Sequence, residues 1–179
     1  MAYGFMIESK IAATDVGSYN RSAVSTTADV PGGGLVKLTA PTTQGEDRYT
    51  AALPTTGNLG DLWMAYNPSY QVLTVNGKSF AGLSIDPRDF TNPQGQTFSI
   101  FKPMKYDNIV VSVDAVSGDS IAVGDVLEGA NGSALLTKVT SHTAGNTAFK
   151  VEWIGTLPFP QAGVGNEFYK AYKLECIEA

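Results

Sequence analysis

Few side chains in this sequence are suited to catalysis, since it holds one histidine, His142, and one cysteine, Cys176. His142 lies in a small polar segment, residues 140–146, between two expected strands. A Ser–His–acid triad needs a positioned nucleophile, and the chain has no Gly-x-Ser-x-Gly sequence to supply one. We therefore expect an exposed loop histidine. Cys176 lies on an alternating apolar strand with no cation nearby to lower its pKa, which predicts a buried structural thiol.

The carboxylates are the remaining source of chemistry, and they gather on expected turns. Calcium loops space their ligands regularly, as Asp-x-Asp-x-Asp-Gly, and that pattern is absent. Turn aspartates commonly bond their own backbone, so we expect no metal site and no cofactor. A pair of acid/base carboxylates, as in glycoside hydrolases, stays open, although no pair stands out. The residues considered are Asp86 and Asp89 on either side of Arg88, and Asp114, Asp119, Asp125 and Glu128.

Glycine runs and aromatic residues offer two further candidate sites. Residues 31–34 and 163–165 lack the Lys-Ser/Thr of phosphate-binding loops, so we interpret them as turns. Trp63, Tyr66 and Tyr70 could form a platform for a sugar ring. We favour a core position for Trp63 and keep a carbohydrate-binding module as an alternative.

Composition excludes several classes of partner. Hydrophobic residues make up 43% of the 179 residues, charged residues only 16%, and the net charge is −5. An acidic chain without a basic run is not expected to bind nucleic acid. No apolar stretch is long enough to span a membrane, and residues 1–7 do not resemble a signal peptide, so we expect synthesis in a cytoplasm. A surface poor in charge suits lasting contact with other protein.

Short apolar runs separated by glycine and proline predict an all-β protein, built of short-stranded antiparallel β-barrel or sandwich modules with an extended N-terminal arm. The Asn76-Gly77 pair between two β-type runs predicts a hairpin, because type I′ turns need positive φ at both central residues. The expected strands cover residues 35–39, 47–53, 61–66, 71–75, 78–83, 98–102, 108–114, 120–127, 134–140, 147–154 and 168–176.

Turn-rich segments with glycine and proline divide the chain into four expected parts. These are an extended arm at residues 1–30, an N-terminal β module at 31–85, a linker at 86–97 and a C-terminal barrel-like domain at 98–179. The arm carries a few apolar residues ahead of a polar stretch, too few to form a core of their own. We expect such a segment to gain order on another protein's surface. The apolar residues are Tyr3, Phe5, Met6, Ile7 and Ile11.

Four segments resemble a group of tailed-phage virion proteins, the small β-rich capsid decoration or cement proteins: residues 62–68, 86–92, 101–103 and 171–176. The resemblance covers roughly residues 60–179, and no functional residue carries over from it. It implies no enzymatic activity and no cofactor. It also implies binding to the outer surface of an expanded icosahedral shell, often as trimers, which braces the shell against internal DNA pressure.

From this resemblance we expect a phage major capsid protein as the partner, a homo-oligomer with a trimer favoured, and a place on the capsid exterior after synthesis in the host cytoplasm. The apolar arm residues named above are the candidate capsid contacts. A tail or baseplate structural protein would have the same composition. A carbohydrate-binding module would need exposed aromatics, and a hydrolase would need a carboxylate or His142 in a pocket.

Overall fold

The computed structural model describes residues 3–43, 45–68, 72–75, 78–81, 87–160 and 166–179, and most of its elements are β-strands. Its helical elements in that part of the chain are single 3₁₀ turns. The all-β class predicted from the sequence is confirmed. No helix among the described residues is long and apolar enough to cross a membrane. The turns are η1 (Ala12–Thr14), η2 (Gly17–Tyr19), η3 (Pro87–Asp89) and η4 (Val113–Ala115).

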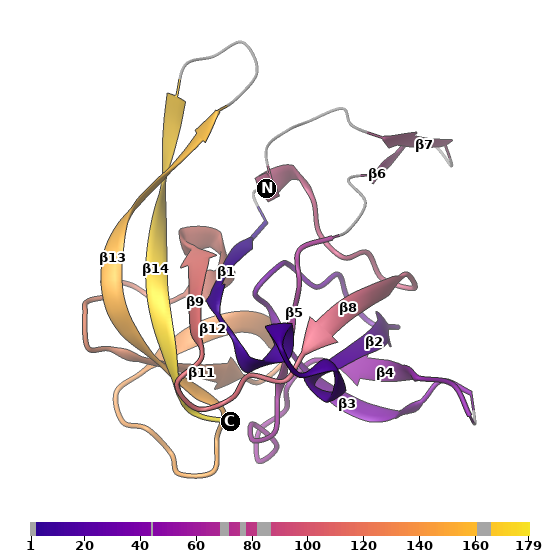
Figure 1. Cartoon of the computed structure of the whole chain (residues 1–179), viewed down its shortest axis with the longest axis horizontal. Helices are drawn as coiled ribbons and strands as arrows, with labels where there is room; N and C mark the ends of the chain where they lie inside the picture. The colour runs from indigo at the N-terminus through magenta and orange to yellow at the C-terminus, as the bar shows by residue number, and fades with distance from the viewer. Residues whose placement is uncertain (1–2, 44, 69–71, 76–77, 82–86, 161–165) are drawn as a thin grey trace.

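Five strands close a barrel in the order β2-β4-β3-β5-β8 (Figure 1). β2 pairs in parallel with β4 and antiparallel with β8, and β5 completes the circle between β3 and β8. Closure gives every barrel strand two neighbours and leaves no open edge. The strands are β2 (Asn20–Ser25), β3 (Leu35–Pro41), β4 (Arg48–Ala52), β5 (Trp63–Ala65) and β8 (Thr97–Phe101).

A second, seven-stranded sheet has the order β1-β9-β14-β13-β11-β12-β10 (Figure 1). Its pairs are antiparallel except β10 with β12. Unlike the barrel it is open, with β1 and β10 at its edges. The strands are β1 (Met6–Lys10), β9 (Asn108–Ser112), β10 (Val116–Ser117), β11 (Val126–Ala130), β12 (Ser133–Val139), β13 (Ala148–Pro160) and β14 (Asn166–Glu178).

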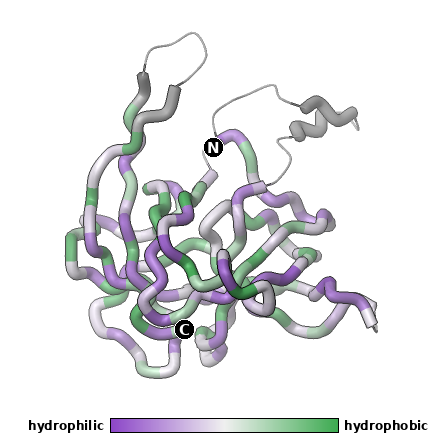
Figure 2. The backbone as a smooth tube through the Cα atoms, viewed as in Figure 1, coloured by the Kyte–Doolittle hydropathy of each residue, from purple (hydrophilic) through white to green (hydrophobic). Residues whose placement is uncertain are grey.

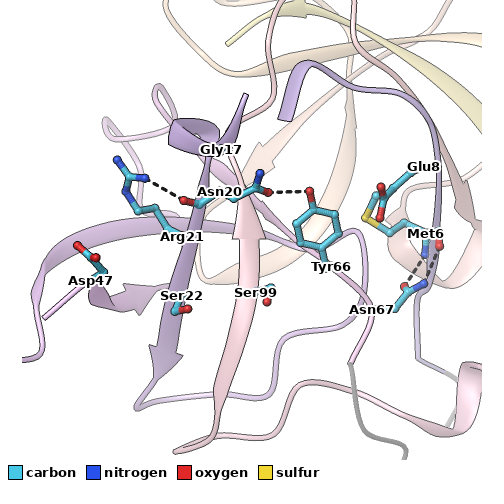
Figure 3. A pocket seen from close by; sticks show the side chains of 10 residues that line it. All are labelled: Met6, Glu8, Gly17, Asn20, Arg21, Ser22, Asp47, Tyr66, Asn67 and Ser99. Atoms are coloured by element: carbon cyan, nitrogen blue, oxygen red, sulfur yellow. Dashed lines mark hydrogen bonds between the residues drawn. The ribbon is translucent and has the colours of Figure 1, made fainter. Parts of the chain in front are cut away.

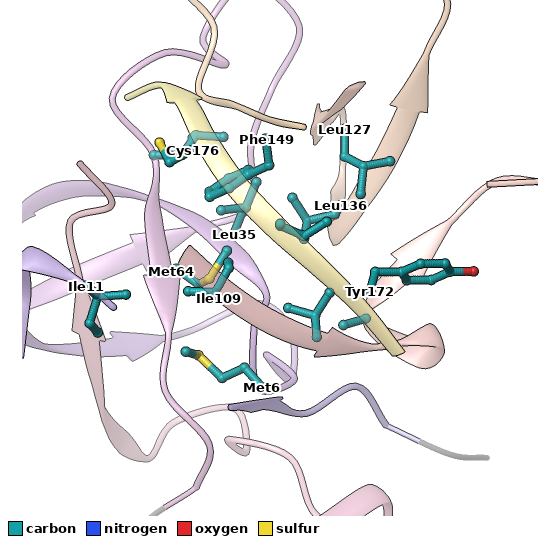
Figure 4. Packing of buried hydrophobic residues seen from close by; sticks show 14 of the residues in the cluster. Met6, Ile11, Leu35, Met64, Ile109, Leu127, Leu136, Phe149, Tyr172 and Cys176 are labelled. Carbon is teal, nitrogen blue, oxygen red and sulfur yellow. The ribbon is translucent and has the colours of Figure 1, made fainter. Parts of the chain in front are cut away.

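The barrel and the seven-stranded sheet pack against one apolar core (Figure 4). Its buried side chains include Leu35 and Met64 from the barrel and Ile109 and Phe149 from the sheet. Hydrophobic and hydrophilic residues alternate along many of the strands (Figure 2), because one side of each strand faces this interior. A smaller cluster inside the barrel takes Ala23, Val36, Ala51, Ala65 and Ile100 from its five strands.

The chain passes between the two sheets twice, from β1 to β2 and from β8 to β9. Both crossings meet at the buried carboxylate of Asp107. The backbone N–H of Ala12 donates to its Oδ1 at 2.8 Å, and that of Met104 donates to its Oδ2 at 2.8 Å. One side chain therefore ties together the segments that connect the barrel to the sheet.

The first thirty residues are not an extended arm, which corrects the sequence prediction. β1 pairs with β9 in the large sheet, and β2 lies between β4 and β8 in the barrel. The segment looked too polar for a strand because the positions that face the narrow barrel hold small residues, Ala23 and Ser25. Ser25 is buried at little cost, since its hydroxyl donates to the Ala28 carbonyl at 2.6 Å.

The predicted division into two modules and a linker is also corrected. β8, assigned from the sequence to the C-terminal domain, closes the barrel of the N-terminal one. Within the expected linker, Phe90 and Asn92 are buried, and Asn92 exchanges two backbone hydrogen bonds with Val30. Asp86, the first residue of the expected linker, lies outside the described residues. Periodicity alone cannot reveal such a segment, because its contacts are made by turns rather than by a strand.

Two hairpins stand out from the body of the fold (Figure 1). The small one, β6 (Val72–Val75) with β7 (Lys78–Ala81), has the register expected around Asn76-Gly77 and is confirmed, although the turn itself lies outside the described residues. The large one, β13 with β14, is longer than predicted, since pairing continues to Pro160 and Asn166. Proline has no N–H to donate, so it is tolerated in a strand that has a neighbour on only one side. The strand pairing can therefore include the prolines of β13.

The distal part of the large hairpin is formed by residues 152–160 of β13 and 166–170 of β14. β13 pairs with β11 only through Lys150, and β14 pairs with β9 only from Ala171 onward. In the pairing register, residues 153–155 lie opposite residues 171–173, which still pair with β9, and from Thr156 and Lys170 outward each strand pairs only with the other among the described residues. This part of the hairpin projects from the sheet (Figure 1). We call this element the β13–β14 ribbon.

The packing of the N-terminal segment can be tested with two phenylalanines of opposite environment. Phe5 is 2% exposed and Phe168 is 64% exposed. We expect Phe5→Ala to lower the free energy of unfolding by about 3–5 kcal/mol, because it leaves a cavity in the core. Phe168→Ala should change it by less than about 0.5 kcal/mol. Urea unfolding measures both, and equally small effects would mean that the N-terminal segment is not part of the folded core.

Candidate functional site

His142 lies between two glutamates that are distant from it in the sequence. It sits in the loop between β12 and β13, and its Nδ1 is 2.7 Å from Glu128 Oε1 while its Nε2 is 2.6 Å from Glu178 Oε2. Glu128 is buried on β11, and Glu178 ends β14. Backbone N–H groups of the same loop also donate to these carboxylates, from Thr143 to Glu128 and from Gly145 to Glu178. We call this arrangement the His142 clasp.

The clasp requires a protonated imidazole, because both ring nitrogens face carboxylate oxygens and both must donate. Hydrogen bonds to Glu128 and then to Glu178 raise the pKa of His142 above its ordinary value. Burial alone would raise the pKa of Glu128, but hydrogen bonds from Asn146, Thr143 and His142 outweigh it and lower that pKa. The pKa of Glu178 is lowered chiefly by its hydrogen bond from His142. All three shifts favour the charged cluster.

This geometry corrects the prediction of an exposed loop histidine. The side chain of His142 is 26% exposed and holds its loop to two strands. Its two partners lie 14 and 36 residues away, so no local spacing in the sequence could identify them. The clasp stabilises the loop against the sheet, and neither ring nitrogen is left to act on a hydroxyl or thiol in this arrangement.

Cys176 is a fully buried free thiol in the apolar core, as predicted. Burial raises its pKa to about 12, and the charge of Asp107 adds to the effect. A thiol with so high a pKa forms little thiolate near neutral pH and is a poor nucleophile. Cys176 therefore serves as a packing residue of the core.

Of the acidic residues on turns, Asp125 behaves as the sequence predicts. Its carboxylate accepts the backbone N–H of Ala122 at 2.7 Å and pairs with Lys138 at 2.7 Å. Among the described residues, no group of three or more histidine, cysteine, aspartate or glutamate residues is placed to hold a metal ion. Asp86 lies outside the described residues. Asp125 thus serves its local backbone.

The candidate capsid contacts of the expected arm do not lie on one free surface. Phe5, Met6 and Ile11 are buried inside this chain, so they are not available to a partner. Ile7 is 38% exposed on β1, and Tyr3 is half-buried, with its N–H donating to the Arg88 carbonyl at 2.8 Å. Strand β1 uses its apolar residues to join the large sheet.

A polar groove of about 790 Å³ lies between β1 and the barrel (Figure 3). Tyr66 donates its hydroxyl to Asn20 Oδ1 at 2.8 Å on the barrel side of the groove. Asn67 bonds the backbone of Met6 on the β1 side. The lining residues are Met6, Glu8, Gly17, Asn20, Arg21, Ser22, Asp47, Tyr66, Asn67 and Ser99. No local pattern in the sequence indicates this groove, because its walls come from two sheets.

Trp63 and Tyr66, two of the three aromatic residues considered as a sugar platform, pack against different apolar clusters. Trp63 is half-buried against the small barrel cluster, with the Arg21 guanidinium over its ring at 6.0 Å. Tyr66 packs against the large core cluster and stacks on Phe101 with ring centroids 4.8 Å apart. Tyr70 lies outside the described residues. Trp63 and Tyr66 therefore act mainly in packing within the chain.

Two exposed aromatic residues lie on the β13–β14 ribbon, and a third, Tyr106, lies just before β9. Phe168 is 64% exposed and Trp153 is 43% exposed. The Trp153 ring lies over Gly155, where any larger side chain would collide with the indole. The opposite strand contributes Tyr169, which is buried beneath the Arg88 guanidinium at 3.7 Å and beside Phe5. In the pairing register Trp153 lies opposite Lys173, close to the sheet, and Phe168 lies opposite Pro158 further out, while Tyr169 ties the ribbon to Arg88 and Phe5.

No protein-family model, curated protein or solved structure matches this chain. The resemblance to phage decoration proteins therefore depends on the four short segments quoted above.

The His142 clasp predicts a pH-dependent contribution to stability. Its histidine part is complete below the ordinary pKa of 6.5 and is lost as pH rises through the raised pKa of His142. Its glutamate part is complete above the ordinary pKa of 4.5 and is lost as pH falls through the lowered values. The difference in unfolding free energy between the wild type and His142→Ala should be largest between pH 4.5 and pH 6.5, and it should shrink as pH rises through the raised pKa of His142. A difference that does not vary with pH would show that the clasp is not charged.

Burial of Cys176 predicts slow thiol chemistry. In the native protein, the reaction with a water-soluble disulfide reagent should be limited by unfolding and should become fast in denaturant. The Cys176→Ser variant supplies the blank for absorbance measurements. Rapid reaction of the native protein at neutral pH would contradict the buried, high-pKa thiol.

Proposed function

We propose that this chain is a non-enzymatic structural protein of a phage virion, which binds the outer surface of the capsid as a homotrimer and stabilises it. The observation that carries the proposal is the β13–β14 ribbon, a projection with exposed aromatic residues and open strand edges. The resemblance described above supplies the class of partner, a major capsid protein. The ribbon supplies the surface that would meet it.

An exposed ribbon has backbone groups and aromatic side chains that a partner protein can cover. Open strand edges present rows of unpaired N–H and C=O groups that readily pair with another chain. Exposed aromatic residues are enriched at protein interfaces, where their burial supplies much of the binding energy. In the pairing register Phe168 and Trp153 lie on opposite faces of the ribbon, and Phe168 lies opposite Pro158 where both strand edges are open, so one partner surface could cover the Phe168 ring and an edge. An isolated two-stranded hairpin is only marginally stable in water, and here its base is secured by the sheet.

Two side chains support a structural rather than a catalytic role. Both ring nitrogens of His142 are held by glutamates, and the Cys176 thiol is buried with a raised pKa. The two residues most suited to nucleophilic chemistry by type are therefore used in packing and in the clasp. We propose that the protein has no catalytic residue and needs no cofactor.

The contacts of the other aromatics favour a protein surface over a glycan as the ligand. Trp63 lies beneath the guanidinium of Arg21, and the hydroxyl of Tyr66 is used by Asn20. Sugar-binding platforms need an aromatic face open to the ligand. Phe168 and Trp153 of the ribbon are more exposed than Trp63 and Tyr66, which suits contact with a partner protein.

Co-sedimentation with assembled phage particles tests the proposal. Wild-type protein should pellet with expanded capsids lacking it, and Phe168→Ser should weaken binding by at least about tenfold, as expected for an interface aromatic. Tyr106→Ser is the matched control, since Tyr106 is 67% exposed near the other end of β14, where its N–H donates to the Cys176 carbonyl. His142→Ala should bind like the wild type.

Three outcomes would contradict the proposal. Binding to isolated tails rather than heads would assign the chain to the tail or baseplate. Binding to glycans with no affinity for particles would favour the carbohydrate-binding module. Equal binding by Phe168→Ser and wild type would show that the ribbon is not the contact surface.

A further inference from the structure

The outer edge of β1 carries backbone groups with no neighbouring strand. β1 pairs with β9 on one side and forms the edge of the sheet on the other. The N–H of Ser112 donates to the Phe5 carbonyl at 2.9 Å, so the backbone of Phe5 faces β9. Because successive residues of a strand direct their N–H and C=O groups to opposite sides, those of Met6 and Glu8 face outward.

Asn67 already occupies the first of these outward positions. The N–H of Met6 donates to Asn67 Oδ1 at 2.9 Å, and Asn67 Nδ2 donates to the Met6 carbonyl at 2.7 Å. The side-chain amide therefore makes the same two bonds as a residue of an adjacent strand. Glu8 is the next outward position, and no hydrogen bond within the described part of the chain satisfies its outward N–H or C=O.

The polar groove lies directly beside this open edge. Glu8 and Met6 line one side of it, and the barrel lines the other (Figure 3). On the barrel side, the cross-strand pair Ser22 and Ser99 presents hydroxyls from β2 and β8. Its volume of about 790 Å³ falls within the range of protein ligand sites. A strand added to β1 would lie about 4.8 Å from it, on the groove side.

The charges of the groove favour a basic ligand. Glu8 and Asp47 line it, while the third charged residue, Arg21, donates to the Asn20 carbonyl at 2.9 Å and lies over Trp63. Burial, followed by the charges of Glu8 and Asp107, raises the pKa of Tyr66 to about 12. The part of the shift that comes from Glu8 and Asp107 reflects a negative potential near the Tyr66 hydroxyl, which a lysine or arginine side chain would offset.

We propose that the open edge of β1 binds an extended, basic segment of a partner protein, which adds to the sheet as an eighth strand and lies in the polar groove. A peptide backbone is the ligand that matches Glu8, because it offers a donor and an acceptor at strand spacing. Lysine or arginine side chains on that segment would lie near Glu8 and Asp47. This site is separate from the β13–β14 ribbon and does not depend on the ribbon's partner.

A short capped peptide of alternating lysine and valine serves as the probe. We expect it to bind the full-length protein and to slow hydrogen exchange at the Glu8 amide by at least about tenfold, because that N–H gains a partner. A peptide with glutamate in place of lysine, and one with proline in place of valine, should each bind at least about tenfold more weakly. Fluorescence anisotropy gives the affinities, and NMR gives the exchange rates.

Two variants locate the site. Gly17 lines the groove and a Cβ there would meet no atom within 4 Å, so Gly17→Gln should fold normally and obstruct the ligand. Glu8→Lys should weaken binding of the basic peptide by at least about tenfold, whereas the matched charge reversal Asp119→Lys, on an exposed turn, should leave it unchanged. Phe168→Ser should also leave it unchanged.

The proposal fails if the Glu8 amide gains no protection at peptide concentrations on the order of 1 mM. It also fails if the acidic peptide binds as well as the basic one, or if Gly17→Gln binds like the wild type. Loss of self-association in Gly17→Gln, without any peptide binding by the wild type, would instead assign the edge to a second copy of this chain.

Discussion

The buried carboxylate of Asp107 joins the only two places in the described topology where the chain passes between the barrel and the large sheet. Each of its oxygens accepts a backbone N–H, one from the segment after β1 and one from the segment after β8. A carboxylate removed from water is costly unless it is hydrogen-bonded, so its position is strongly specified. It sets how the two sheets meet over their common core, in which Leu35 and Phe149 pack from opposite sides.

The two proposed binding surfaces follow from that arrangement. The large sheet is open, and its edge strand β1 is joined directly to the barrel by the segment through Ala12. The same sheet supports the base of the hairpin of β13 and β14, so the ribbon extends from a rigid platform. An edge and a projection are the places where β-proteins usually meet partners, because their backbone groups are not all paired. In this chain both are built on the large sheet, and the barrel supplies the second wall of the groove.

Much of the strand pattern could be predicted from the sequence, for local reasons. The hairpin around Asn76-Gly77 and the alternation before Cys176 are signals carried by neighbouring residues. The role of residues 20–25 could not be predicted, because a narrow barrel accepts alanine and serine where a wider core needs larger side chains. The buried turn around Asn92 was missed for a related reason, since its hydrogen bonds to Val30 and Tyr66 join distant segments.

The candidate sites show the same division between local and distant information. The burial of Cys176 follows from its strand, whereas the partners of His142 come from β11 and from the end of β14. The groove needs a β1 edge, an asparagine from after β5 and a barrel surface, and no window of sequence contains all three.

Photo-crosslinking from position 168 in assembled particles tests the central claim most directly. A photoreactive phenylalanine analogue replaces Phe168, at a site exposed in the free chain. The account predicts covalent adducts with the major capsid protein after irradiation of purified heads, and none from the same analogue at position 106. Adducts from position 106 but not from 168, or adducts to tail proteins alone, would contradict it.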